Sequence, residues 1–182
     1  MKFQIDQGIE ILASTPGVLR SMLAGLGDLW ITGNYGEGTF SPFDVVGHLI
    51  HGERTDWIPR AKIILAHGES QPFEPFDRYA MFEESKGRSI AELLDTFESL
   101  RRENIQTLGD LNLTPERLNF RGTHPALGPV TLGQLLATWV VHDLNHLAQI
   151  AKAMAFQYAD NVGPWREYLT IFENQPVRRE KS

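Results

Sequence analysis

Residues 139–150, with the sequence WVVHDLNHLAQI, combine an apolar helical pattern with two histidines. His142 and His146 are four residues apart, which is about 400° of helical rotation, so both imidazoles lie on one face of the predicted helix. Burying two imidazoles among leucine, valine and tryptophan side chains is unfavourable unless something satisfies their ring nitrogens. A transition-metal ion would do so, whereas the alternative is a pair of half-buried polar residues on an amphipathic helix. The run therefore predicts a helix with two candidate metal ligands.

A third histidine lies in a second apolar run, VVGHLI, at residues 45–50. His48 together with His142 and His146 would form a three-histidine site shared between two helices. Such a site leaves coordination positions open, as a catalytic metal ion requires. His51, three residues further along, is an alternative third ligand, a fourth ligand, a proton shuttle or an exposed residue. Its polar surroundings favour exposure.

The two-histidine segment departs from the zincin metalloprotease motif, in which a glutamate directly follows the first histidine as the general base. Here that position holds Asp143, which we interpret as an acid on the helix surface. Asn145 is expected to be solvated. His67 near a helix end and His124 in a loop are left out of the site.

Periodic apolar segments separated by proline and glycine predict an all-α protein with four main helices. The expected helices span about residues 5–27, 41–66, 89 onward and 131–158, with a short terminal helix at 164–169. Ser41, Ser89 and Thr131 are the expected N-caps. Pro16 predicts a break or kink in the first helix, with Thr15 capping its second part, and Pro59 predicts a kink or an early end in the second helix.

The segments between these helices are expected to be loops, at residues 30–40, 67–88 and 120–129, and no strand is predicted. The connection at 67–88 is long enough to join helices that are parallel or not adjacent in a bundle. Residues 1–182 are expected to form one domain, with a frayed tail from about residue 175.

Composition excludes several function classes. The formal net charge is −6, which argues against a nucleic-acid-binding protein because such proteins carry a basic face. The chain has no cysteine, so it has no disulfide, no thiolate metal ligand and no cysteine nucleophile. No apolar stretch approaches ~20 residues and the N-terminus lacks the apolar core of a signal peptide. We therefore expect a soluble, cytoplasmic protein that does not enter a membrane.

Two segments, GHLIHGE at residues 47–53 and VTLGQLLATWVVHDLNHLAQI at residues 130–150, resemble the DinB-like (DinB/YfiT) superfamily. The resemblance implies a four-helix bundle in an up-down-down-up arrangement. It also implies a divalent metal ion held by His48, His142 and His146. Family members with known activity resemble thiol-dependent transferases and isomerases that use bacillithiol or mycothiol, and homodimers are frequent among them.

The leading hypothesis is therefore a metal-dependent enzyme of the thiol-dependent transferase type that acts on a small molecule. A bound cation lowers the pKa of a coordinated thiol. Because the chain has no cysteine, that thiol would be a low-molecular-weight cofactor. Imidazole ligands suit several metals, of which zinc or nickel is favoured here.

Two other hypotheses remain open. The first is a metal-dependent hydrolase in which Asp143 or Glu53 acts as the base toward water. The second is a non-enzymatic, stress-related metal-binding protein. The sequence identifies no catalytic or cofactor-binding residue, although one group of arginines is able to bind a cofactor carboxylate and one group of aromatic residues is able to line a pocket. These groups are Arg54, Arg60 and Arg121, and Phe43, Trp57 and Trp139.

Overall fold

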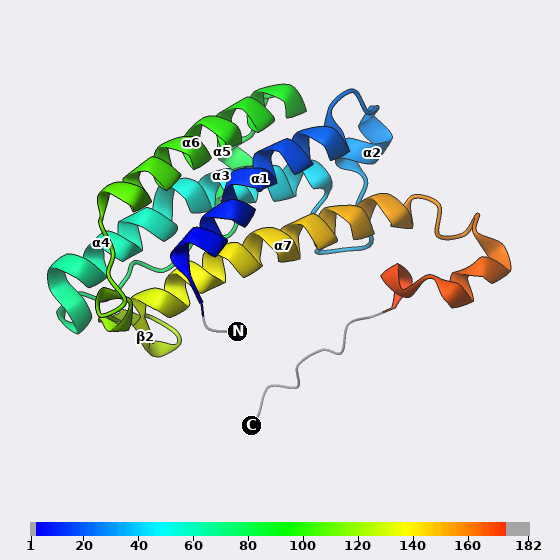
Figure 1. Cartoon of the computed structure of the whole chain (residues 1–182). Helices are drawn as coiled ribbons and strands as arrows, with labels where there is room; N and C mark the ends of the chain where they lie inside the picture. Colours follow the sequence, from blue (N-terminus) through cyan, green and yellow to red (C-terminus); the bar gives the residue numbers. More distant parts are fainter. Residues whose placement is uncertain (1–2, 174–182) are drawn as a thin grey trace.

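The computed structural model describes residues 3–173, which form a bundle of long helices (Figure 1). The α-helices are α1 (Ile5–Leu23), α2 (Asp28–Thr32), α3 (Pro42–Thr55), α4 (Trp57–His67), α5 (Ala80–Glu84), α6 (Ile90–Asp110) and α7 (Leu132–Phe156). Two strands and four short 3-10 helices complete the described chain: β1 (Arg121–His124), β2 (Gly128–Thr131), η1 (Gly68–Ser70), η2 (Arg117–Asn119), η3 (Gly163–Tyr168) and η4 (Thr170–Phe172).

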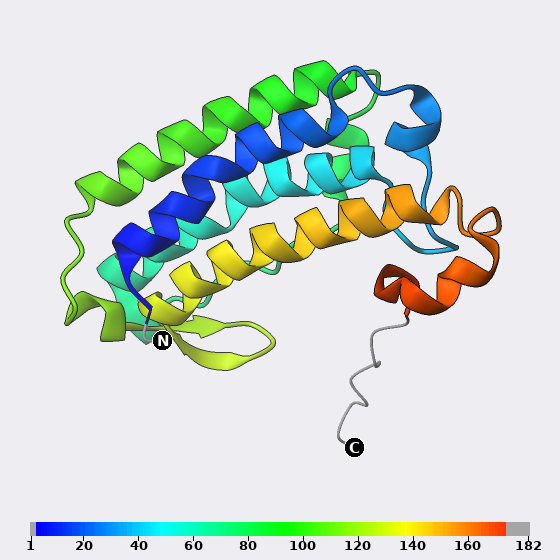
Figure 2. The same cartoon turned by 45° about the vertical axis from the view of Figure 1, so that its right-hand side comes forward.

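The bundle has four long helical members: α1, the consecutive pair α3–α4, α6 and α7 (Figures 1 and 2). Helices α1 and α6 are antiparallel, because Arg20 late in α1 bonds Asp95 early in α6, whereas the Leu12 carbonyl earlier in α1 bonds Arg101 later in α6. Residues 68–89 bring the chain back along the bundle, so α6 runs parallel to α3. The fold confirms the predicted four-helix bundle with its long connection after the second helix.

The three predicted N-caps are also confirmed. The side chains of Ser41, Ser89 and Thr131 each accept a hydrogen bond from the backbone N–H three residues further along. In each case the side chain at that third position accepts a bond from the cap's own N–H, so two free donors of the first helical turn are satisfied reciprocally. These boxes fix where α3, α6 and α7 begin.

Of the break or kink predicted at Pro16, the break is wrong, because α1 continues through that residue. Proline has no N–H to donate to the carbonyl four residues earlier, which here belongs to Leu12. That carbonyl instead accepts a hydrogen bond of 2.9 Å from the Arg101 guanidinium. Thr15 does not cap a helix; its hydroxyl donates to the Ile11 carbonyl at 3.0 Å. A partner from another helix thus offsets the hydrogen bond that proline removes.

The second predicted helix does end early, although at Asp56 rather than at Pro59. In a continuous helix the ring of Pro59 would clash with the carbonyl four residues earlier. That carbonyl belongs to Thr55, which is the last residue of α3. The position of the break therefore follows from the position of the proline.

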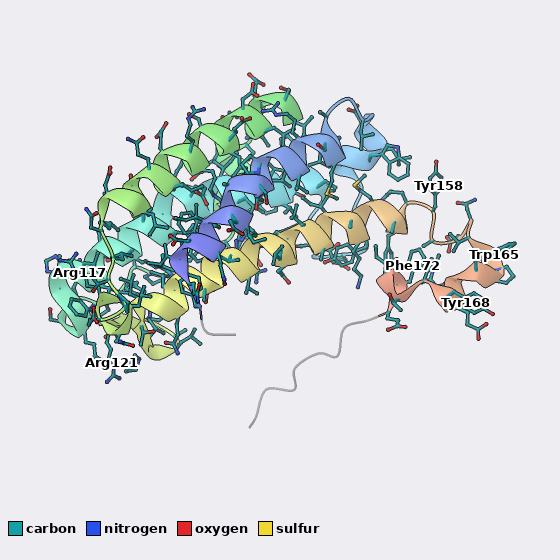
Figure 3. All side chains as sticks on the ribbon, in the orientation of Figure 1. Arg117, Arg121, Tyr158, Trp165, Tyr168 and Phe172 are labelled. Atoms are coloured by element: carbon teal, nitrogen blue, oxygen red, sulfur yellow. The ribbon has the colours of Figure 1, made fainter. Side chains whose placement is uncertain are left out.

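The loops contain more structure than the sequence pattern indicates. The expected loop at 30–40 begins within α2, and the connection at 67–88 contains α5. The expected loop at 120–129 is wrong, because β1 and β2 form an antiparallel hairpin there (Figure 2). The predicted terminal helix at 164–169 is the 3-10 helix η3, where Trp165 and Tyr168 point away from the bundle (Figure 3). The predicted frayed tail at 175–182 lies outside the described residues.

The core is divided into two apolar clusters. One contains Leu19 of α1, Val45 of α3 and Ile150 of α7, and the other contains Leu12 of α1 and Trp139 of α7. On each long helix, buried polar residues separate the two clusters: Thr15 on α1, Glu53 on α3, Arg101 on α6, and Asp143 and His146 on α7. A buried polar layer therefore crosses the middle of the bundle. Within residues 3–173 no helix is long and apolar enough to span a bilayer.

Arg101 lies at the centre of this polar layer and forms hydrogen bonds to the other three long helical members of the bundle. Its Nη1 donates to the Leu12 carbonyl and to Asp143 at 2.5 Å, and its Nη2 donates to Asp143 at 3.0 Å and to Glu53 at 2.8 Å. The Arg101, Glu53 and Asp143 side chains are at most 1% exposed. Burial lowers the pKa of Arg101, but the hydrogen bond that Arg101 donates to Asp143 and the charge of Glu53 outweigh it and raise the pKa above its usual value.

Replacing this arginine leaves two buried carboxylates without their cation. Arg101→Met is therefore expected to lower the free energy of unfolding by about 3–5 kcal/mol, measured by urea denaturation. Arg102→Met is the matched control, because the neighbouring arginine is exposed, and it should change stability by no more than ~0.5 kcal/mol. Equal stabilities of the two variants would contradict the role assigned to the buried cation.

Candidate metal centre

The structure brings His48 of α3 together with His142 and His146 of α7. The Nε2 atoms of His48 and His142 are 3.2 Å apart, and those of His146 and His142 are 3.1 Å apart. The candidate ligand atoms of the three residues all lie within 4.8 Å of one another. Metal–imidazole bonds of about 2.0–2.1 Å place neighbouring ligand nitrogens roughly 3–3.5 Å apart. The three rings thus have the spacing of ligands of a single ion.

Burial keeps these imidazoles neutral, which is the form that binds metals. Burial is the largest cause of lowered pKa values at all three, followed at His48 and His142 by the charge of His146. The pKa falls to about 4 at His48 and to about 2 at His142. The lone pairs are therefore available at neutral pH.

The far nitrogens of the three rings have unequal support. The Nδ1 of His146 lies 2.7 Å from Gln149 Oε1 and donates to it, so the Nε2 of that ring carries the free lone pair. The Nδ1 atoms of His48 and His142 are buried and have no hydrogen-bond partner among the described residues. Aromatic rings hold these two in place instead. Trp57 meets His142 edge-on at 5.0 Å and Phe76 meets His48 at 5.4 Å between ring centroids.

One residue of the triad, His142, lies at a groove on the outer face of α7. A shallow groove of about 520 Å³ runs along this helix up to His142, and it is lined mainly by Ala137, Thr138, Val141 and Asn145. His48 and His146 are buried, at 8% and 7% exposure, whereas His142 is half-buried. His142 is thus the most exposed residue of the triad, although the Nδ1 of its ring is buried.

The interpretation of Asp143 as a surface acid is wrong, because its side chain is completely buried against Arg101. Glu53 is also occupied: one oxygen accepts from Arg101 and from the Trp139 indole, and the other accepts from the Asn104 amide at 3.0 Å. Both carboxylates are engaged by a buried cation. Neither is therefore placed to act as a base toward water at the triad.

His51 is buried, at 7% exposure, so the expectation of an exposed residue is also wrong. Its Nδ1 lies 2.9 Å from Oε1 of Glu84, which comes from α5, and the other oxygen of Glu84 accepts from Arg54. Its Nε2 makes no hydrogen bond within residues 3–173 and is not fully enclosed. Phe76 contacts both this ring, at 5.0 Å, and the ring of His48. His51 thus lies beside the triad, with its Nδ1 held by a carboxylate.

The three arginines considered for cofactor binding all have protein partners. Arg54 bonds Glu84, Arg60 bonds Asp56, and Arg121 lies 3.6 Å from Glu69 in the distant hairpin region. Of the aromatic candidates, Trp57 contacts the triad, whereas Trp139 is fully buried and stacks on Trp57 at 5.9 Å. Phe43 is half-buried and packs against the cluster around Leu19.

Sequence reasoning missed the residues that the connection between α4 and α6 contributes. Phe76, Arg78 and Glu84 come from this connection, which has no regular apolar period. Gly47 on α3 allows a close approach: a Cβ at that position would lie 2.5 Å from Oγ of Ser85, just after α5. This glycine was the one signal that the connection packs over α3.

The family model of the DinB superfamily matches residues 11–150, which include all three histidines of the triad. Among solved structures, YfiT from Bacillus subtilis, described as a probable metal-dependent hydrolase with an unusual four-helix bundle topology, is similar over 90% of this chain and 90% of its own. The TM-score is 0.72 at 24% sequence identity, which shows a shared fold. No curated protein sequence matches significantly. Because the family model covers most of its length, the chain belongs to the DinB superfamily.

Proposed function

We propose that this protein binds one divalent transition-metal ion, zinc or nickel, through the Nε2 atoms of His48, His142 and His146, and that it is an enzyme acting on a small molecule. The observation that carries the proposal is the convergence of three neutral imidazoles from two helices, 3.1 and 3.2 Å apart at their closest nitrogens. Buried histidines without an ion would leave lone pairs facing one another. One ion satisfies all three.

A bound divalent cation lowers the pKa of a thiol or of water at an open coordination position. The protein supplies the three rings from α3 and α7 and buries His48 and His146. The leading candidate for the nucleophile is a low-molecular-weight thiol in a transfer reaction, because the superfamily members with known activity resemble thiol-dependent transferases and isomerases. The groove beside His142 gives such a cofactor access from the outer face of α7.

A second candidate is metal-dependent hydrolysis, as in the description of YfiT. One observation favours it. His51 receives its orientation from Glu84 at 2.9 Å, so its Nδ1 carries the proton and its free Nε2 is able to accept one from a nucleophile. The base would therefore be His51 and not Asp143 or Glu53, both of which are committed to Arg101.

Metal content tests the site directly. The tag-free wild-type protein, supplied with zinc and nickel and then freed of excess metal, should contain close to one equivalent by elemental analysis. His48→Ala, His142→Ala and His146→Ala should each lose it, because two imidazoles remain. His67→Ala is the matched control, since this histidine lies exposed at the end of α4 and should leave the content unchanged.

A wild-type protein without metal under these conditions would reject both enzymatic candidates. Retention of a full equivalent by folded variants of two or three triad positions would place the metal elsewhere. Folding of each variant is checked by circular dichroism, so loss of metal is separated from loss of structure.

The two candidates differ in their need for a thiol and for His51. In hydrolysis of activated esters by the metal-loaded protein, His51→Asn should lower the rate about 10²-fold, typical for loss of a general base, with metal content unchanged. His124→Asn, in the distant hairpin, is the control. Turnover that appears only with an added thiol, at equal rates in wild type and His51→Asn, would reject hydrolysis and favour the transferase.

A further inference from the structure

Arg78 differs from the other described arginines in its lack of a polar partner. Within residues 3–173 it makes no ion pair and no hydrogen bond through its side chain. Each of the others donates a hydrogen bond to a carboxylate, a hydroxyl or a backbone carbonyl, except Arg121, which forms an ion pair with Glu69. The neighbouring carboxylate of Asp77 accepts a bond from the backbone N–H of Tyr79 at 3.0 Å. The guanidinium of Arg78 therefore keeps its full charge and all its donors.

Two aromatic rings hold this cation near the triad. Its Cζ lies 5.8 Å from the ring centroid of Phe40 and 5.5 Å from that of Tyr79. Phe40 in turn contacts His48, at 6.0 Å between ring centroids. The rings attract the cation without neutralising it, because their faces carry no net charge. An arginine held in this way is ready to bind an anion.

The arginines of α3 and α4 are paired: Arg54 with Glu84, and Arg60 with Asp56. Arg78 is thus the free cation beside the triad in the described part of the chain.

We propose that Arg78 binds a carboxylate of the small molecule whose other end occupies the open side of the metal centre, so that the protein selects anionic ligands. The proposal rests on the proposed function, since it needs a metal ion at the triad. The planar guanidinium forms two parallel hydrogen bonds to a carboxylate, which gives direction as well as attraction. With the three imidazoles neutral, both the ion and Arg78 are positive, and an anionic ligand complements both.

A matched pair of ligands tests this inference on the full-length, cobalt-loaded protein. The probes are 3-mercaptopropionate and its neutral counterpart 3-mercaptopropionamide, and the readout is the change in the visible absorption of cobalt on titration. Wild type should bind the carboxylate about tenfold more tightly than the amide, the effect of about 1.4 kcal/mol for one charge-assisted pair. The preference should shrink as salt is added, because the guanidinium is exposed.

In Arg78→Met the ratio of the two affinities should fall to near one while the amide binds as before. Arg78→Lys should keep part of the preference, since it retains charge but not the planar fork. Arg121→Met is the control, because this exposed arginine lies in the distant hairpin and should keep the full ratio. A wild-type ratio near one, or a full ratio in Arg78→Met, would overturn the inference.

Failure of the proposed thiol chemistry is distinguishable from failure of this inference. If cobalt binds but neither thiol changes its spectrum, the thiol candidate fails. Arg78 is then tested by the same comparison with a hydroxamate in place of the thiol as the metal-binding group. The two ligands are succinic acid monohydroxamate and the analogue in which its carboxylate is an amide. The tenfold preference and its loss in Arg78→Met would support the inference, and their absence would overturn it. A protein that binds no cobalt overturns both.

Discussion

The contact on which the rest of the structure depends is the buried Arg101 guanidinium. From α6 it bonds the Leu12 carbonyl of α1, Glu53 of α3 and Asp143 of α7, so a single side chain joins the four long helical members of the bundle. Burying a cation with two carboxylates is expensive unless each donor and acceptor is well placed. That requirement allows few positions of each helix along the bundle axis. The two apolar clusters on either side are able to pack only at those positions.

The same contact sets the position of the candidate metal centre. Asp143 lies between His142 and His146 in sequence, and Glu53 follows His48 by five residues on α3. When Arg101 binds both carboxylates, α3 and α7 are fixed against each other and the three Nε2 atoms converge. Trp139, which donates to Glu53, also stacks on the ring of Trp57 that supports His142. The polar layer thus orients the triad through the helices and through aromatic packing.

The fold and the triad could be predicted because they depend on local patterns. Four-residue spacing places His142 and His146 on one face, and capping boxes mark where α3, α6 and α7 begin. The errors concern partners far away in sequence. Pro16 is tolerated in α1 because Arg101, 85 residues later, bonds the carbonyl that the proline leaves free. No local pattern indicates that pairing.

The residues around the triad could not be predicted from the sequence for a related reason. The connection between α4 and α6 has no period, so its sequence does not show which of its side chains face the bundle. Its residue Glu84 converts His51 from an expected exposed residue into a buried, oriented imidazole, and its residue Arg78 places a free cation near the metal centre. Both are set by how this segment packs over α3, which Gly47 alone indicated.

The most direct measurement is X-ray absorption spectroscopy at the metal edge of the nickel- or zinc-loaded full-length protein. Three imidazole nitrogens at about 2.0–2.1 Å, with the remaining positions filled by exchangeable ligands such as water, are the expected result. One or two imidazoles in the fitted shell, or a shell of carboxylate oxygens alone, would contradict a metal centre formed by His48, His142 and His146.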